Sequence, residues 1–130
     1  MMSIPSNYVF TPSHEWVLDN GDGTITLGVS DHAQELLGDV VFVELPEIGR
    51  EVEAGEEFSL VESVKAASDI YSPVTGEVVA VNDELEDSPE TVNEAPYEGG
   101  WIVKIKLSDP SELTKLLNAD AYAATIAEED

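Results

Sequence analysis

The sequence predicts a mainly β fold, a flattened barrel or sandwich of two pseudo-symmetric sheets with a short helix near residues 31–37 and a helical tail. Short runs with the alternation typical of strands, separated by glycine, proline and acidic turns, follow one another from residue 24 to residue 107. Part of this region also repeats with a shift of 27 residues. A chain of 130 residues can bury a real core, so we expect residues 1–130 to form a single domain.

The first strong strand signal is the run TITLGVS at residues 24–30. Ile25, Leu27 and Val29 alternate there with small or polar residues, which is the pattern of a half-buried strand. The turn-forming run DNGDG comes just before it. We therefore expect a hairpin that leads into a strand with one buried face.

A short helix of about two turns is predicted for residues 31–37. Ser30 or Asp31 can accept hydrogen bonds from the first free backbone N–H groups of this helix. Gly38 can end it in the left-handed conformation.

The runs DVVFVEL, EEFSLVES, GEVVAVN and GGWIVKIKL follow as further short strands. These runs predict a core made mainly by strands. In the last run, one predicted strand face carries Trp101, Val103, Ile105 and Leu107, and the other carries Ile102, Lys104 and Lys106.

The chain changes character at SDPSELTKLL, where a helical tail is expected over residues 110–127. Asp109 as the cap, Pro110 at the first helical position and Glu112 at the third form a typical helix start. The final acidic residues are expected to fray. The apolar stripe of the tail consists of Leu113, Leu116 and Leu117.

The internal repeat is the pattern P-x-x-G-x-x-V, which begins at Pro46 and again at Pro73. The match continues to Gly55 and Asn82, and glycine and asparagine are the residues that most easily adopt a positive φ in a turn. Two similar strand-turn-strand units predict a sandwich with a pseudo-two-fold axis.

Lys65 lies almost midway between the two repeats and is the only lysine before Lys104, in a chain with 5 basic and 28 acidic residues. If residues 56–73 form a hairpin, Lys65 lies at its tip with its side chain directed away from the body. Taken alone, it could be an ordinary solvated turn residue. Its position in the repeat favours instead a lysine that a modifying enzyme finds on a folded hairpin.

The composition excludes several classes of function. A net charge of −23 and a pI near 4.1 disfavour nucleic acid and anionic membrane surfaces as partners, and they predict basic docking surfaces on protein partners. The absence of cysteine excludes disulfides, thiolate metal sites and a protein thiol nucleophile. No secretion, import or membrane-spanning pattern is present, so we expect a soluble cytoplasmic protein without a metal site.

Longer motifs spread over nearly the whole chain resemble the H-protein family of the glycine cleavage system, which belongs to the lipoyl/biotinyl carriers. They are SHEW, HAQELLGDVVFVELPE, VESVKAASDIYSPVTGEVVAVN and PYEGGWIVKIK. The resemblance implies lipoyl-domain sheets and lipoate covalently attached to Lys65. It also implies a recognition sequence for lipoate-attaching enzymes, namely Glu62, Ser63, Val64 and Ala66, with Gly49 and Gly76 as paired glycines that frame the hairpin.

The same resemblance implies a monomeric carrier that catalyses nothing itself and serves glycine catabolism and one-carbon metabolism. Glycine decarboxylase loads the aminomethyl group of glycine onto the lipoyl group, and an aminomethyltransferase passes the one-carbon unit to tetrahydrofolate. Dihydrolipoamide dehydrogenase then reoxidises the dithiol. A chain with no cysteine and two histidines fits this role.

Glu15, Val29 and Asp69 match family positions that line a cleft for the aminomethyl-loaded arm. A carboxylate that keeps the amine protonated, in a cleft that excludes water, protects the loaded group. By itself, Glu15 could equally be an ordinary surface acid. We expect hydrogen-bonded structural or surface roles for His14 and His32, and core positions for Trp16 and Trp101.

Three alternative functions compete with glycine cleavage. A biotin carrier uses a similar hairpin but resembles a lysine flanked by methionines, whereas Val64 and Ala66 flank Lys65 here. An acidic adaptor that is never modified is a different class, and an unchanged intact mass after co-expression with a lipoate-attaching enzyme would support it. A relay that donates lipoate to other carriers would share every motif, so the sequence leaves this alternative open.

Overall fold

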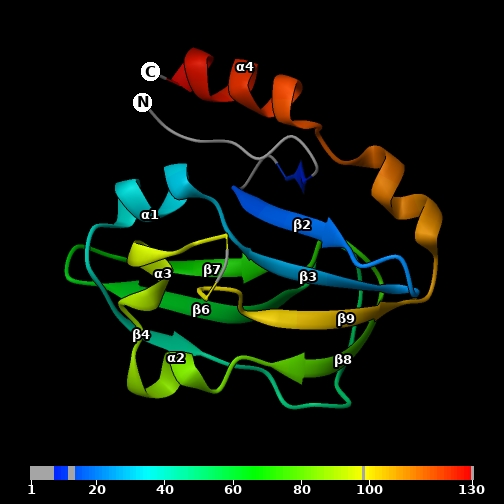
Figure 1. The fold of residues 1–130 in the computed structure, drawn as a ribbon, viewed down its shortest axis with the longest axis horizontal. Coiled ribbons are helices and arrows are strands. Elements are labelled where there is room, and N and C mark those ends of the chain that lie inside the picture. The colour runs from blue at the N-terminus through cyan, green and yellow to red at the C-terminus, as the bar shows by residue number, and fades with distance from the viewer. Residues whose placement is uncertain (1–7, 12–13, 98, 130) are drawn as a thin grey trace.

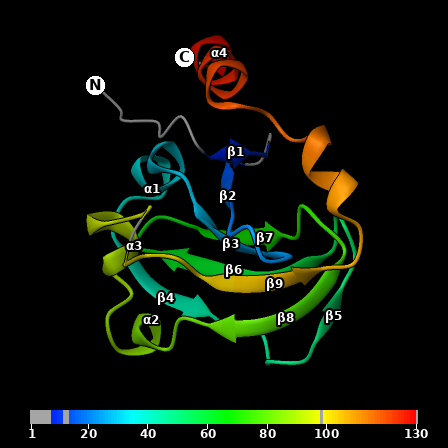
Figure 2. The same ribbon diagram turned by 45° about the vertical axis from the view of Figure 1, so that its right-hand side comes forward.

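The computed structural model describes residues 8–11, 14–97 and 99–129, and two antiparallel sheets face each other in it (Figures 1 and 2). The three-stranded sheet has the order β4 (Val40–Glu44), β6 (Glu57–Ser63) and β7 (Ala67–Tyr71). In spatial order, the six-stranded sheet consists of β1 (Val9–Phe10), β2 (Glu15–Asp19), β3 (Thr24–Val29), β9 (Val103–Leu107), β8 (Gly76–Val81) and β5 (Glu51–Val52). The predicted two-sheet, mainly β fold is confirmed.

The sequence repeat has a direct structural counterpart. A shift of 27 residues carries β4 onto residues 67–71, which are the bounds of β7, and carries β5 into β8. β4 and β7 flank β6, and β5 pairs with β8. The repeat ends there, because the same shift carries β6 onto residues 84–90, where α2 (Glu84–Asp87) lies.

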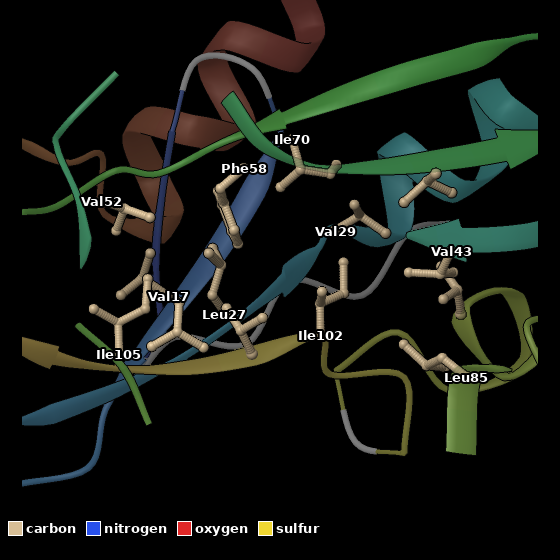
Figure 3. Close-up of a cluster of buried hydrophobic side chains, with 14 of the residues drawn as sticks. Val17, Leu27, Val29, Val43, Val52, Phe58, Ile70, Leu85, Ile102 and Ile105 are labelled. Carbon is tan, nitrogen blue, oxygen red and sulfur yellow. The ribbon is translucent and has the colours of Figure 1, made fainter. Parts of the chain in front are cut away.

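The main core fills the space between the two sheets (Figure 3). Val17, Leu27 and Ile105 enter it from the larger sheet, and Phe58 and Ile70 enter it from the smaller one. Each of these side chains is at most 4% exposed. Burial of one such side chain contributes about 1.5–3 kcal/mol, so this cluster is the principal stabilising feature of the fold.

β3 differs from its prediction, because both of its faces are buried. Thr26 is 8% exposed, and Gly28 is covered by the indole of Trp16, which lies 2.7 Å from the position that a Cβ would take. A second cluster covers this outer face, where α4 (Ala119–Glu129) packs near β1 (Figure 1). Its buried members are Phe10, Trp16, Tyr122 and Ile126.

The predicted short helix forms as α1 (Asp31–Leu37), and Ser30 is its cap, accepting a hydrogen bond from the Ala33 N–H at 3.1 Å. Gly38 has a φ of 77°, as predicted, and its N–H donates to the Gln34 carbonyl at 3.0 Å. Its ψ of −156° lies outside the left-handed helical region. That backbone conformation is nearly restricted to glycine.

The C-terminal tail is divided into two helical pieces. The first piece is a 3-10 helix, η1 (Pro110–Lys115). Asp109 is its cap, and the Asp109 carboxylate accepts a hydrogen bond from the Ser111 N–H at 3.1 Å. Leu117 then forms a bridge with Phe10, and α4 follows and continues to Glu129, further than expected. Within the described ranges, no helix is both long and apolar enough to cross a membrane.

Glu112 of η1 has a different role from the predicted one. Its carboxylate accepts hydrogen bonds from the Thr75 N–H at 2.7 Å and the Thr75 hydroxyl at 3.1 Å. This pair joins the tail to the segment between β7 and β8. The short helix α3 (Thr91–Glu94) lies, like α2, in the long connection from β8 to β9.

Candidate functional site

The turn between β6 and β7 presents Lys65 at the end of the hairpin. The Ser63 N–H donates to the Ala66 carbonyl at 2.7 Å, which closes the turn. The Ser63 hydroxyl oxygen also accepts hydrogen bonds from the Lys65 N–H at 3.2 Å and the Ala66 N–H at 3.1 Å. We call residues 62–66 the tip. Lys65 is exposed there on a turn with a defined backbone.

The side chain of Lys65 does not extend freely from the body, contrary to the prediction. Its stem lies against Gly38, since a Cβ placed on Gly38 would be 3.2 Å from Lys65 Cε. The neighbouring Val64 N–H donates to the Asp39 carbonyl at 3.0 Å. The segment after α1 therefore supports the tip, and we call its residues 38–40 the platform.

Asn93 of α3 holds this platform in place. Its amide nitrogen donates to the Gly38 carbonyl at 2.8 Å and to the Gln34 side-chain oxygen at 3.0 Å, and its oxygen accepts from the Val40 N–H at 2.8 Å. Sequence reasoning missed Asn93. No local pattern links a residue of the β8–β9 connection with the end of α1, more than 50 residues earlier.

The other predicted recognition residues divide between the tip and the far end of the hairpin. Glu62 is half-buried on β6, opposite Phe42 and Ala67, and Ala66 is exposed on the turn. Gly49 and Gly76 both belong to the other end: the Gly49 N–H donates to the Val78 carbonyl of β8 at 2.7 Å, and Gly76 is the first residue of β8. We call residues 49–57 and 71–76 the base of the hairpin.

The two paired glycines are required for different reasons. Gly49 has a φ of 96° and open space around it, so its backbone conformation favours glycine. Gly76 lies in β8, where a Cβ would be 2.1 Å from the Lys106 carbonyl oxygen. Asn82 likewise differs from Gly55, because Gly55 has a φ of 89° whereas Asn82 does not adopt a positive φ. The Asn82 amide instead donates to Gly99 and Trp101 carbonyls at 2.7 and 2.8 Å.

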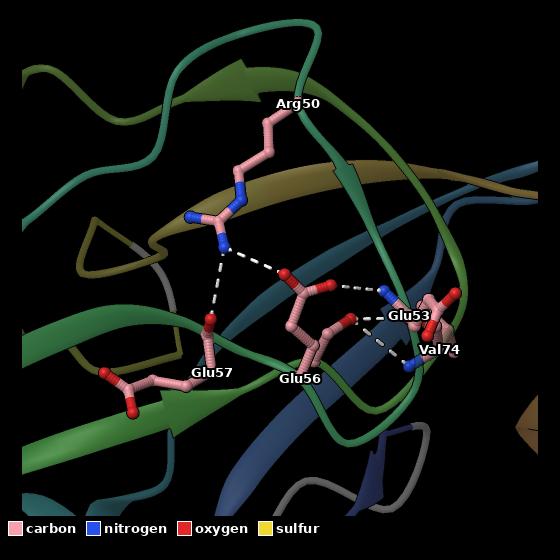
Figure 4. Close-up of polar contacts among 6 residues, drawn as sticks. Arg50, Glu53, Glu56, Glu57 and Val74 are labelled. Atoms are coloured by element: carbon pink, nitrogen blue, oxygen red, sulfur yellow. Dashed lines mark hydrogen bonds and ion pairs between the residues drawn. The ribbon is translucent and has the colours of Figure 1, made fainter.

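Hydrogen bonds and an ion pair stabilise the base (Figure 4). Arg50 donates to the Glu56 carboxylate at 3.0 Å and to the Glu57 carbonyl at 3.2 Å. The other Glu56 oxygen accepts from the Glu53 N–H at 3.0 Å. The hydrogen bond from the Glu53 backbone and the charge of Arg50 lower the pKa of Glu56. The Gly55 N–H donates to the Ser72 carbonyl at 2.7 Å, which joins the two strands of the base.

Glu15 is the most deeply buried of the predicted site residues with a charge, at 1% exposure. The Thr11 hydroxyl donates to its carboxylate at 2.5 Å, and the Glu15 N–H donates to the Thr11 hydroxyl oxygen at 3.1 Å. Glu15 and Thr11 line a small cleft of 210 Å³ together with Gly55, residues 71–73 and Leu116. The carboxylate therefore lies beside the base of the hairpin.

The three predicted cleft residues are only partly brought together. Glu15 on β2 pairs with Val29 on β3, but Val29 is 2% exposed and belongs to the main core. Asp69 is exposed on β7, opposite Leu60, and neither it nor Val29 lines the cleft beside Glu15.

The histidines and Trp16 occupy structural positions, as predicted, whereas Trp101 is not in the core. His14 Nδ1 lies 2.9 Å from the Tyr122 hydroxyl, and the ring of His32 packs beside it with centroids 4.8 Å apart. Trp16 Nε1 donates to the Pro96 carbonyl at 2.8 Å within the second cluster. Trp101 is partly buried and packs against this cluster, and the Lys104 ammonium lies 5.4 Å from the Trp101 ring.

Comparison with known proteins gives one consistent family. The model of the glycine cleavage H-protein family matches residues 8–129. The chain is 75% identical over 120 residues to a glycine cleavage system H protein of Vibrio parahaemolyticus, covering 92% of this chain and 95% of that protein. It is 66% identical over 131 positions to one of Chromohalobacter salexigens, covering 100% of both.

A solved structure is also similar. The crystal structure of a glycine cleavage system H protein from Mycobacterium marinum superimposes with a TM-score of 0.87 at 37% identity. The match covers 95% of this chain and 99% of that one. The similarity therefore extends over both sheets.

Proposed function

Because this chain belongs to the glycine cleavage H-protein family, we propose that it is the lipoyl carrier of the glycine cleavage system, a non-catalytic subunit that moves the aminomethyl group of glycine between enzymes. The observation that carries this proposal is the exposed primary amine of Lys65 on a hydrogen-bonded turn. Lipoate attached there supplies a redox-active pair of sulfur atoms, which a chain without cysteine does not have.

The residues of the tip fit covalent attachment. The amine nitrogen of Lys65 attacks the acyl carbon of an activated lipoyl ester, so that a C–N bond forms, the bond to the leaving group breaks and the amine proton passes to solvent. The Ser63 hydroxyl orders the backbone on which the amine is presented. The Lys65 stem packs against Gly38, where a side chain would occupy the space that the stem fills.

Recognition of this lysine by lipoate-attaching enzymes divides between the tip and the base. Glu62, Ser63, Val64 and Ala66 flank Lys65 in the chain, and we assign to them the surface that such an enzyme reads. Gly49 and Gly76 contribute through the fold, since both lie at the base and allow its backbone to close. The partners of the loaded carrier are glycine decarboxylase, the aminomethyltransferase and dihydrolipoamide dehydrogenase, which meet a chain of net charge −23 with basic surfaces.

Glu15 is the residue that we assign to hold a positively charged group on the carried arm. Its carboxylate is oriented by Thr11 and is buried beside a small cleft. Val29 pairs with Glu15 on the neighbouring strand, and Asp69 is an exposed carboxylate on β7, two residues before Tyr71, which lines the cleft.

The proposal is tested by lipoylation of the purified unmodified protein with a lipoate-attaching enzyme, lipoate and ATP. Intact mass and a peptide map should show one lipoyl group on Lys65 and none on Lys65→Arg, whose guanidinium stays protonated. Lys106→Arg is the matched control and should be modified like the wild type. Lipoate on the Lys65→Arg variant would overturn the assignment, and an unmodified wild type would favour the adaptor.

The carrier role requires a second measurement. Lipoylated protein should support exchange of bicarbonate with the carboxyl group of glycine by glycine decarboxylase, and Lys65→Arg should not. Lipoylated protein that gives no exchange would contradict the role in glycine cleavage.

A further inference from the structure

Exposed apolar side chains gather around the tip. Among the described residues, seven large hydrophobic side chains are exposed, and four of them lie near Lys65. Large apolar residues that cluster on a surface mark interaction sites, whereas single ones need no explanation. The four are Val64 at 67% exposure, Leu36 at 60%, Val41 at 53% and Phe42 at 46%. We call these four residues the tip patch.

Three segments bring the tip patch together. Leu36 lies two residues before Gly38, against which the Lys65 stem packs. Val41 lies two residues after Asp39, whose carbonyl accepts from the Val64 N–H. Figure 1 shows the β6–β7 turn beside the segment that joins α1 to β4.

A register shift in β4 explains why two successive residues are exposed. β4 pairs with β6 as Val40 with Ser63 and then Phe42 with Glu62, so Val41 is an extra residue without an opposite partner. Such a bulge lets neighbouring side chains leave the usual alternation, and it re-aims them. Val41 and Phe42 are accordingly both exposed, while Val40 and Val43 are buried.

The tip patch has an acidic rim. Glu35 and Asp39 are exposed beside it, Glu62 lies opposite Phe42, and no lysine or arginine occurs between residues 31 and 49. Lys65 is the only basic residue of the tip. An apolar surface with a single-sign rim fits a partner with an apolar depression and basic residues around it.

We propose that the tip patch docks the lipoate–protein ligase that attaches lipoate to Lys65, and that this enzyme offers an apolar depression ringed by lysine or arginine. This inference rests on the proposed function. An enzyme that forms a bond to the Lys65 amine must bring its active site against the lysine stem and so cover the residues beside it. Enzymes that act on the far end of an attached arm can remain further from these residues.

The test is steady-state lipoylation of the full-length unmodified chain by a purified bacterial lipoate–protein ligase with lipoate and ATP. We expect Phe42→Ser and Leu36→Ser each to raise KM about tenfold while kcat at saturation stays near the wild-type value, because buried aromatic and aliphatic anchors dominate docking. Ile48→Ser is the matched control, since Ile48 is 65% exposed but lies outside the tip patch, and its KM should stay within about twofold of the wild type.

Circular dichroism and thermal unfolding should show that all three variants are folded, because the replaced side chains are exposed. KM values equal to the wild-type value for both tip-patch variants would overturn the proposal. So would normal lipoylation kinetics combined with a loss of exchange by glycine decarboxylase, which would assign the tip patch to that enzyme. A wild-type chain that is not lipoylated would overturn the proposed function, and this inference with it.

Discussion

The two ends of the β6–β7 hairpin are built in opposite ways. At the tip, Lys65 and its neighbours are exposed, with Val64 at 67%, and one serine and the platform after α1 hold the turn. At the base, an Arg50–Glu56 ion pair holds the segment before β6, the Gly55 N–H donates to the Ser72 carbonyl, and the adjoining Glu15 is 1% exposed. The tip is thus accessible to a modifying enzyme, whereas the base borders a buried carboxylate.

This difference separates two requirements of a carrier. A modifying enzyme must reach the lysine without disturbing the core, and a buried carboxylate needs a surrounding structure that keeps it in position. We therefore expect variants at the base to change the free energy of unfolding with little direct effect on lipoylation. Variants at the tip should do the reverse.

Gly76→Ala should have the largest effect on stability. The added Cβ would lie 2.1 Å from the Lys106 carbonyl oxygen and 2.8 Å from Ile105 Cγ2, and the β9 backbone cannot move without breaking its ladder with β8. Overpacking typically costs about 1–3 kcal/mol, and contact with backbone places this variant at about 3 kcal/mol or more. Urea denaturation measures the loss.

Gly49→Ala is the comparison variant for this prediction. Gly49 has a φ of 96° and nothing within 4 Å of an added Cβ, so only backbone strain of about 1–2 kcal/mol is expected. Equal losses for the two variants would show that contact with β9 is not what requires glycine at residue 76.

Thr11→Val should reduce stability by an intermediate amount. Valine keeps the shape of threonine but removes the hydroxyl that donates to the Glu15 carboxylate, and loss of a partner by a buried polar group costs about 1–3 kcal/mol. Lipoylation of Lys65 should proceed at the wild-type rate. Thr125→Val removes a hydroxyl from α4 that donates to the Ala121 carbonyl, and it should cost less than about 0.5 kcal/mol. If both valine variants were equally stable, the Thr11 bond would not be what holds Glu15.

Local signals in the sequence were sufficient for the features that depend on neighbouring residues. The Ser30 cap and Gly38 bounded α1 correctly, and the 27-residue repeat located β4 and β7 together. The tip followed from the same repeat, because a turn midway between two strand pairs has few other places to lie.

Features that depend on distant contacts could not be predicted in this way. Gly49 and Gly76 look equivalent in the repeat. The difference between them arises from the pairing of β8 with β9, which places the β9 backbone where a side chain at residue 76 would clash. The second buried face of β3 depends on Trp16 and on a helix about 100 residues later. The platform under Lys65 depends on Asn93, which lies in another segment.

Ser63→Ala should slow lipoylation with a modest loss of stability. The variant removes the acceptor of the Lys65 and Ala66 N–H groups, and an exposed hydrogen bond contributes about 0.5–1.5 kcal/mol. If the turn must be ordered before the amine is presented, a cost of about 1 kcal/mol corresponds to about a fivefold lower kcat/KM. Ser108→Ala changes an exposed serine after β9 and should leave kcat/KM unchanged. A wild-type rate for Ser63→Ala would mean that the enzyme imposes the turn itself.

Glu62→Ala should have the smallest effect on kcat/KM for lipoylation, and this effect should come from the loss of one carboxylate near Lys65. Glu62 lies three residues before Lys65 on β6. An exposed charge pair with a basic residue of the enzyme contributes about 0.2–1 kcal/mol, which corresponds to about a 1.4-fold to fivefold loss in kcat/KM. Glu57→Ala removes the same charge from the same strand at the base, so it controls for the change in net charge. The difference between the two variants should shrink as salt is added, because screening weakens an exposed pair. Equal rates for Glu62→Ala and Glu57→Ala at low salt would show that the enzyme senses the acidity of the whole chain and not a carboxylate at the tip.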